Sequence, residues 1–413
     1  MNRRVVITGM GAMTPLGESV EQFWNGLISG QSGVGPMTLA DPSAYPCQIS
    51  GEVSNFNPEN YMDKREARRM SRFSQLGIAA TLEAFQNSGI SDGVLDSTRT
   101  GVIIGNGNGG YPDIEAAVRQ IARGEGPRLS PFYFPMTLPN MAAANISRLF
   151  GAEGVCSTIT TACAASTHAI GDALNAIRNG VADVIITGGA EAGISELGLA
   201  GFCAMRALSS RNDSPESASR PFDLDRDGFI PSEGAGILVL EDLEHAKARG
   251  AEIFAEVIGT GTSSDAFHQF QPDSNGNGAA RAIKLALADA GIEPNEIDYV
   301  NAHGTSTPLN DVIETTAIKR ALGERAESVP ISSTKSMIGH ALGASGGMEA
   351  VACVKTIQTG VIHPTINYAQ TDPDCDLDYV PNISRQANVE TVLSNSFGFG
   401  GQNACIIFRK YEK

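Results

Sequence analysis

The sequence contains no run of about eighteen consecutive apolar residues, the length that a helix needs to cross a bilayer. The apolar stretch at residues 5–7 is also too short to form the core of a signal peptide. We therefore expect no membrane association and a cytoplasmic location. Low-complexity segments and long polar linkers are missing too, so the 413 residues predict two fused halves rather than two tethered domains.

Paired cysteines and positive charge are also scarce. The seven cysteines are an odd number, are scattered, and include no Cys-x-x-Cys pair. Neither a zinc site nor a disulfide framework is indicated, and we expect no metal. The 30 Lys and Arg residues face 46 Asp and Glu residues, which gives a formal net charge of −16. Because an acidic surface repels phosphate, we expect no nucleic-acid partner.

One segment, residues 64–72, is basic against this acidic background. It places four arginines at i, i+3, i+4 and i+7, the spacing of one helix face: Arg65, Arg68, Arg69 and Arg72. A solvated helix face explains the pattern, and so does a docking surface for an acidic partner.

Short β-branched runs alternate with longer helical patterns, which is typical of parallel strands joined by crossover helices. Strands are predicted at residues 4–8, 101–104, 183–187, 236–240, 253–258, 298–301 and 391–394. Helices are predicted at residues 73–87, 166–179, 279–290, 313–322 and 347–359. The fold class is therefore α/β.

Two pairs of segments resemble each other. Residues 5–11 and 256–261 both run from an apolar strand into glycines, and residues 182–189 resemble residues 296–304. Two related halves, residues 1–250 and 251–413, would explain these echoes. The general likeness of all α/β strands is the alternative.

Two motifs suggest cofactors and are rejected. Residues 105–110 match the dinucleotide fingerprint G-x-G-x-x-G, but Tyr111-Pro112-Asp113 intervenes where a helix should begin at once. Residues 223–228 start like a calcium-binding EF-hand loop, yet Gly234 stands at the twelfth position, where the loop needs Glu.

Three other segments carry groups suited to catalysis. Cys163 lies among small residues just before a helical pattern, where a thiolate gains from the helix dipole and free amides. His303 follows a short apolar strand, and His340 lies in a glycine-punctuated polar segment. Residues 395–403 form a glycine-rich turn whose N–H groups could build an oxyanion hole. A buried structural thiol, structural histidines and a plain tight turn are the alternatives.

Together these segments resemble the β-ketoacyl-[acyl carrier protein] synthases, condensing enzymes of the thiolase superfamily, and specifically the elongating type II synthases. The similarity runs from Val5 to Phe408 and rests on six motifs in the same order. They are Thr161-Ala162-Cys163, Gly188-Gly189-Ala190-Glu191, Arg220-Pro221-Phe222-Asp223, and residues 301–307, 335–340 and 395–401.

The resemblance implies a five-layered αβαβα fold with two pseudo-symmetric halves, assembled as a homodimer. It implies an acyltransferase that performs decarboxylative Claisen condensation in fatty acid elongation. The partner would be an acyl carrier protein that brings its own phosphopantetheine, so no enzyme-bound cofactor is expected. A ketosynthase of a specialised polyketide or polyene pathway stays open, and a thiolase or a non-catalytic chain-length partner fits less well.

The resemblance also gives roles to individual residues. Cys163 would be the nucleophile, and His303 and His340 would stabilise the enolate formed from malonyl-carrier. Phe399 would supply an oxyanion amide and act as a gate. Lys335 would pair with Glu349 and hold the histidine loop. The remaining roles are substrate binding by Thr305, Thr307, Asn108, Phe270 and Gly400, and carrier docking by Lys64, Arg65, Arg68 and Arg69.

Three positions depart from the family pattern. Asn108 stands where an apolar residue usually lines the acyl tunnel, Phe270 replaces a small hydroxyl residue, and Gln402 replaces Thr or His. None of them belongs to the Cys-His-His set, so they bear on the choice of substrate rather than on the chemistry.

Overall fold

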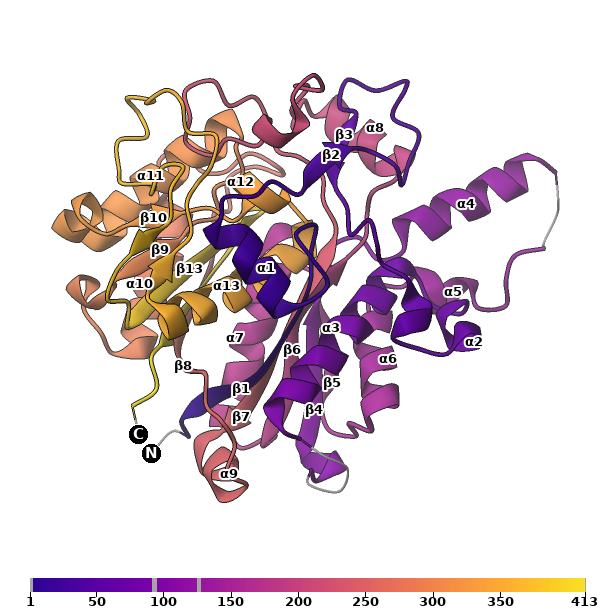
Figure 1. Cartoon of the computed structure of the whole chain (residues 1–413), viewed down its shortest axis with the longest axis horizontal. Coiled ribbons are helices and arrows are strands. Elements are labelled where there is room, and N and C mark those ends of the chain that lie inside the picture. Colours follow the sequence, from indigo (N-terminus) through magenta and orange to yellow (C-terminus); the bar gives the residue numbers. More distant parts are fainter. Residues whose placement is uncertain (1–2, 91–94, 125–127, 413) are drawn as a thin grey trace.

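A long sheet crosses the molecule in the computed structural model, which describes residues 3–90, 95–124 and 128–412 (Figure 1). Within these residues the sheet has ten strands, in the order β10-β9-β13-β14-β8-β1-β7-β6-β4-β5. The strands of one half are β1 (Val5–Met13), β4 (Thr100–Gly105), β5 (Cys156–Ile159), β6 (Val184–Glu191) and β7 (Gly234–Asp242). Those of the other are β8 (Ala255–Ser264), β9 (Tyr299–Asn301), β10 (Ile331–Ser332), β13 (Thr391–Gly398) and β14 (Gln402–Arg409). The seven predicted strands are all present, and β5, β10 and β14 add to them.

The two halves of the sheet repeat one arrangement. The orders β1-β7-β6-β4-β5 and β8-β14-β13-β9-β10 correspond strand by strand. In each half the first two pairings are antiparallel and the last two are parallel. The halves join where Val5–Ile7 of β1 pairs antiparallel with Ala255–Val257 of β8.

Helices complete five layers. The central layer is α7 (Ala165–Arg178) and α13 (Ser345–Thr359), and each of them contacts strands of both halves. Outside one half lie α3 (Arg72–Ser88) and α6 (Met141–Phe150), and outside the other lie α10 (Asn277–Ala290) and α11 (Pro308–Leu322) (Figure 1). The predicted αβαβα architecture is confirmed.

Smaller elements decorate these layers. The remaining helices are α1 (Val20–Ile28), α2 (Lys64–Ala67), α4 (Tyr111–Ala122), α5 (Tyr133–Thr137), α8 (Glu196–Ala204), α9 (Leu243–Ala248) and α12 (Lys335–Ile338). Two small sheets pair β2 (Val34–Pro36) with β3 (Ile49–Gly51), and β11 (Val361–Ile362) with β12 (Arg385–Gln386). No helix among the described residues combines the length and the apolarity needed to cross a membrane.

The glycines of the first sequence echo have the same use in both halves. A Cβ on Gly11 of β1 would lie 1.8 Å from the carbonyl oxygen of Ala80 in α3, and one on Gly261 of β8 would lie 2.1 Å from that of Ala282 in α10. Only glycine lets each helix backbone come this close to its strand. This echo therefore reflects a repeated packing contact.

The second echo pairs the wrong strands. Residues 182–189 run into β6, whereas residues 296–304 contain β9, and the sheet order makes β13 the counterpart of β6. Gly188 and Gly189 lie inside β6, whereas Gly304 comes three residues after the end of β9. The likeness is therefore local and does not mark equivalent positions.

The basic segment is not one helix. Helix α2 ends after Ala67, Met70 and Ser71 are buried, and α3 starts at Arg72. The Arg72 guanidinium bonds the buried carboxylate of Glu233 at 2.7 Å, so it is not part of an exposed face. The N–H groups of Arg69 and Met70 bond the carbonyl oxygens three residues earlier, and Ser71 is extended, so the four arginines do not share one helix face.

The rejected cofactor motifs have clear structural roles. We expected Tyr111-Pro112-Asp113 to separate the glycines from the next helix. This was wrong, because these residues form the first turn of α4. The amides of Gly107 and Asn108 nevertheless donate to the Glu191 carboxylate, at 2.7 and 3.3 Å, and so do not face a phosphate. In the EF-hand-like segment, the buried carboxylate of Asp223 accepts backbone N–H groups instead.

Gly11→Ala should lower the free energy of unfolding by about 2 kcal/mol or more, because the new methyl group meets the backbone of α3. Gly35→Ala is the matched control, since a Cβ on Gly35 in β2 would meet nothing within 4 Å. Thermal denaturation of both variants checks this. Equal melting temperatures would contradict the close-approach argument.

Candidate active site

Cys163 lies on a tight turn at the start of the central helix α7. The turn, Ala162–Ala164, begins with Ala162 in the left-handed region (φ 49°), and Cys163 is 4% exposed. The His168 ring braces this turn, because its Nδ1 lies 3.0 Å from the Thr161 hydroxyl and 3.1 Å from the Ala164 carbonyl oxygen. The sulfur is therefore held at a fixed place beneath the first turn of α7.

His303 follows β9 and is fixed through its backbone. The amides of His303 and Gly304 donate to the two carboxylate oxygens of Glu314 on α11, at 2.8 and 2.7 Å. Asn395 of β13 donates to the same carboxylate at 3.2 Å. Because Glu314 is fully buried, it fixes the His303 loop without taking part in the cavity.

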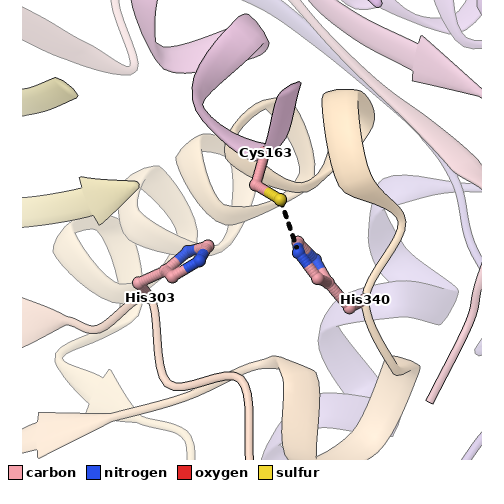
Figure 2. Close-up of side chains that lie close together, drawn as sticks. All are labelled: Cys163, His303 and His340. Atoms are coloured by element: carbon pink, nitrogen blue, oxygen red, sulfur yellow. Dashed lines mark hydrogen bonds between the residues drawn. The ribbon is translucent and has the colours of Figure 1, made fainter. Parts of the chain in front are cut away.

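His340 faces the sulfur directly. Its Nε2 lies 3.0 Å from the Sγ of Cys163 (Figure 2). Its Nδ1 lies 3.0 Å from the hydroxyl of Ser345. The rings of His303 and His340 stand 5.4 Å apart, centroid to centroid, at an interplanar angle of 85°. A small group bound between them would meet a nitrogen from each ring and the sulfur at once.

A buried ion pair stands behind His303. The Lys335 ammonium on α12 bonds the Glu349 carboxylate on α13 and lies 3.5 Å from Nδ1 of His303. An ammonium has only donors to offer, so Nδ1 accepts and the proton of the neutral ring is on Nε2. The predicted pairing of Lys335 with Glu349 is thus present in the structure.

The Cys163 sulfur and one ring nitrogen from each of His303 and His340, all possible metal ligands, lie within 4.8 Å of one another. A thiophilic cation such as Zn²⁺ binds ligands of these kinds at shorter, tetrahedral spacing. The positive charge of Lys335 beside His303 opposes a cation there. The set therefore suits a polarised organic group better than a metal ion.

Burial controls the protonation states. It lowers the pKa of both imidazoles well below the usual range, and the charge of Lys335 lowers it further, so both rings are neutral at neutral pH. Burial also raises the pKa of the Cys163 thiol to about 12, although Lys335 and the amides of Phe399 and Cys163 oppose the shift. The helix N-terminus that we expected to favour a thiolate is outweighed by burial, so Cys163 is a neutral thiol at neutral pH.

A cavity of about 300 Å³ leads to the sulfur, lined by Cys163, His303, His340, Thr305, Thr307, Phe270 and Phe399 among others. The hydroxyls of Thr305 and Thr307 are 2.9 Å apart. A tight apolar crevice of about 10 Å³ continues past His340, between Phe202, Phe229 and Leu342. An acyl chain can extend past His340 only if these side chains move.

Two family models match the chain, "Beta-ketoacyl synthase, N-terminal domain" over residues 2–246 and "Beta-ketoacyl synthase, C-terminal domain" over residues 254–369. The chain belongs to the β-ketoacyl synthase family. A Synechocystis protein named 3-oxoacyl-[acyl-carrier-protein] synthase 2 is 49% identical and covers 99% of both chains. A Staphylococcus aureus protein of the same name is 47% identical over 100% of this chain and 99% of its own.

Solved structures agree with this placement. The ishigamide ketosynthase/chain length factor superposes with a TM-score of 0.94 at 38% identity and covers 100% of both chains. A β-ketoacyl synthase from Burkholderia phymatum gives 0.93 at 37% identity, over 99% of this chain and 100% of that one. The predicted family, thiolase-like fold and acyl-transferring enzyme class are therefore confirmed.

In this ketoacyl synthase, not every predicted site residue lines the cavity. Gly400 is exposed, and its N–H donates to the carbonyl oxygen of Gln269 at 3.0 Å. The Asn108 amide nitrogen is buried against Gly193, which lines the narrow crevice, and has no hydrogen-bond partner among the described residues. Lys64, Arg65 and Arg68 are exposed on the surface.

Phe399 presents both a backbone and a side-chain group to the site. Its amide faces the sulfur, and its ring stands 6.5 Å from that of Phe202, centroid to centroid. The neighbouring Gly398 must be glycine, since a Cβ there would lie 2.6 Å from the Thr161 carbonyl oxygen. Residues that hold the site from behind, such as Glu314 and Ser345, were not predicted, because nothing in their local sequence marks them.

Proposed function

We propose that this synthase transfers an acyl group to Cys163 and condenses it with malonyl-[acyl carrier protein], giving 3-oxoacyl-[acyl carrier protein] and carbon dioxide in fatty acid elongation. The arrangement that carries the proposal is Cys163 at 3.0 Å from His340, with His303 on the other side of one cavity. The names of the full-length relatives support it.

Acyl transfer begins when His340 Nε2 accepts the thiol proton as the sulfur attacks the thioester of the incoming acyl-carrier. The amides of Cys163 and Phe399 face the sulfur and would donate to the oxyanion of the tetrahedral intermediate. When the carrier thiolate departs, His340 returns the proton to it. Cys163 then holds the acyl group as a thioester, and the histidine is neutral again.

Decarboxylation needs two donors at one oxygen. With Lys335 at Nδ1, the Nε2–H of His303 points into the cavity. Ser345 can donate to or accept from His340 Nδ1, because a hydroxyl does both, so His340 can present an Nε2–H as well. As the malonyl carboxylate leaves as carbon dioxide, the electron pair moves onto the thioester oxygen. The enolate carbon then attacks the carbonyl carbon of the Cys163 thioester, and the bond between that carbon and the sulfur breaks. The released Cys163 thiolate takes up a proton from solvent, which restores the thiol.

The phosphopantetheine arm comes with the carrier protein, so the enzyme needs no cofactor of its own. Thr305, Thr307 and Phe270 line the cavity where the arm would lie. We assign Asn108 to the acyl pocket through its contact with Gly193, and Gly400 to the turn that carries the Phe399 gate. The division of the chain into residues 1–250 and 251–413 falls between β7 and β8 and fits the family matches to residues 2–246 and 254–369.

The carrier would dock on Lys64, Arg65, Arg68 and Arg69. Exposed Arg68 and half-buried Arg69 lie beyond α2, and the Arg69 guanidinium stands 4.7 Å above the ring of Phe132. Basic side chains on a chain of net charge −16 attract an acidic partner to this place.

We also propose a homodimer through the edge of the sheet. Among the described residues, strand β5 pairs with β4 alone, and its residues are exposed or partly exposed, whereas the opposite edge strand β10 is buried. Large apolar side chains are also exposed on α4 and α5, including Ile121 (56%) and Phe134 (68%). An open sheet edge and an exposed apolar surface on one molecule both fit pairing with a second copy.

The wild-type chain should sediment at about twice its mass of 43.3 kDa. Ile121→Glu combined with Phe134→Glu should shift it toward monomer, because charge replaces the apolar contact. Ile383→Glu, at another exposed isoleucine, is the control and should leave the dimer intact. Analytical ultracentrifugation of the three proteins measures the mass in solution. A wild-type protein that sediments as a monomer would rule out the dimer.

Arg68→Glu combined with Arg69→Glu should raise KM for malonyl-carrier by about 10-fold or more, at about 1 kcal/mol per reversed charge. KM for a malonyl-pantetheine thioester should change little, because that substrate does not use the docking surface. Lys284→Glu with Lys410→Glu is the matched control on other exposed lysines. Equal changes in both KM values would mean that the arginines form only a solvated face.

The two half-reactions can be separated by substitution. Cys163→Ala should lose acylation and condensation but still release carbon dioxide from malonyl-carrier. His303→Ala should keep acylation and lose decarboxylation by about 100- to 1000-fold, because one oxyanion donor is removed. His340→Ala should reduce decarboxylation similarly and should also slow acylation, because it removes the group that accepts the thiol proton. Labelled acyl incorporation and carbon dioxide release, measured separately, test this. Full condensation by Cys163→Ala would exclude it as the nucleophile.

A further inference from the structure

The catalytic turn has a second copy in the other half of the molecule. The turn Ala162–Ala164 precedes α7, and the turn Leu342–Ala344 precedes α13. Each begins with a residue in the left-handed region, Ala162 at φ 49° and Leu342 at φ 43°. Gly343 therefore occupies the position that corresponds to Cys163.

The strands that end beside these turns correspond as well. β6 and β13 hold equivalent places in the two halves of the sheet, are both eight residues long, and end at Glu191 and Gly398. A Cβ on Gly398 would lie 3.4 Å from the amide nitrogen of Cys163. With no side chain at Gly398, that amide stays open to a substrate oxyanion.

In the second copy a side chain fills this place. One carboxylate oxygen of Glu191 accepts the Gly343 N–H at 3.2 Å and the Gly107 N–H at 2.7 Å. The other accepts the Asn108 N–H at 3.3 Å and the Asn106 side-chain amide at 3.4 Å. The carboxylate thus sits among N–H donors as a bound anion would.

The carboxylate is enclosed and has no cation to balance it. Glu191 is 0% exposed, and the ion pairs found among the described residues do not include it. A Cβ on Gly343 would lie 2.8 Å from the carboxylate, so glycine is needed to make room for it. Burial raises the pKa of the Glu191 carboxyl to about 7, and the N–H groups of Gly107, Gly343 and Asn108 oppose this rise. These donors favour the charged form, which is the major form above about pH 7.

The Glu191 carboxylate is linked to the catalytic imidazole. The turn that it holds lies between His340 and Ser345, whose hydroxyl bonds Nδ1 of that histidine at 3.0 Å. The carbonyl oxygen of Gly343 accepts from the Ser166 hydroxyl on α7, the helix that carries Cys163. A shift of this turn would therefore move His340 relative to the sulfur.

We infer that Glu191 is a positioning residue whose carboxylate acts as a built-in anion: it fills the second copy of the oxyanion hole and so holds the turn that aims His340 at Cys163. The inference rests on the proposed condensation chemistry. A general packing role would require only a side chain of the right size at this place. The role inferred here requires a negatively charged group that accepts the N–H donors.

Chemical rescue tests the inference. Glu191→Ala should lower kcat for condensation by about 10- to 100-fold, since buried N–H donors lose their acceptor. KM for the carrier should stay nearly unchanged. Added formate, the smallest carboxylate, should restore kcat in a saturable way and raise the melting temperature of the variant. Glu83→Ala is the matched control, because Glu83 also accepts two backbone N–H groups but lies away from the site. Formate should not raise its activity.

Loss of kcat in a folded Glu191→Ala without any rescue by formate would overturn the inference, as would full activity of that variant. If Glu191→Ala does not fold, Glu191→Gln of similar shape gives the answer: a lowered kcat supports a need for the anion, and an unchanged kcat overturns it. If the wild-type enzyme does not condense at all, the proposed function fails. The melting temperature of Glu191→Ala in formate then still reports whether the hole binds an anion.

Discussion

The packing of α7 and α13 between the two halves of the sheet is the constraint on which the site depends. Both helices must approach other backbones on every side, and glycine makes this possible. A Cβ on Gly346 would lie 2.2 Å from the Thr167 hydroxyl on α7, and one on Gly347 would lie 2.3 Å from the Gly236 carbonyl oxygen on β7. The close contact brings the first turns of both helices together, so Cys163 of one half meets His340 of the other.

Burial then decides how protons move in the site. The same packing that aligns the side chains removes them from water, which keeps the imidazoles neutral and the thiol protonated. In the proposed reaction, new charge develops at the sulfur and at the thioester oxygen, close to His340, the amides at the sulfur and the Lys335–Glu349 ion pair. A solvated site would lose this contrast between the resting state and the transition state.

The sequence predicted the features that local chemistry controls. The predicted strands and helices all fall on observed ones, with ends that differ by up to six residues, because β-branched runs and the glycines after helices act locally. Cys163, His303 and His340 could be named from their segments, and the structure brings them together. The basic segment was misjudged because a turn and the extended Ser71 separate α2 from α3, and the second echo failed because its two segments belong to strands that are not counterparts in the sheet. Glu191 and Glu314 act only through amides that are distant in sequence, so no local pattern marks their roles.

The repeated halves of the sheet give the molecule two similar pockets of backbone N–H donors, and the two pockets have opposite requirements. One has to stay empty for each new substrate, and the other is kept permanently occupied by Glu191. A substitution that suits one half would harm the other if it were made at the equivalent position. Equivalent positions in the two halves must therefore carry different residues. Activity depends on these differences as much as on the shared architecture.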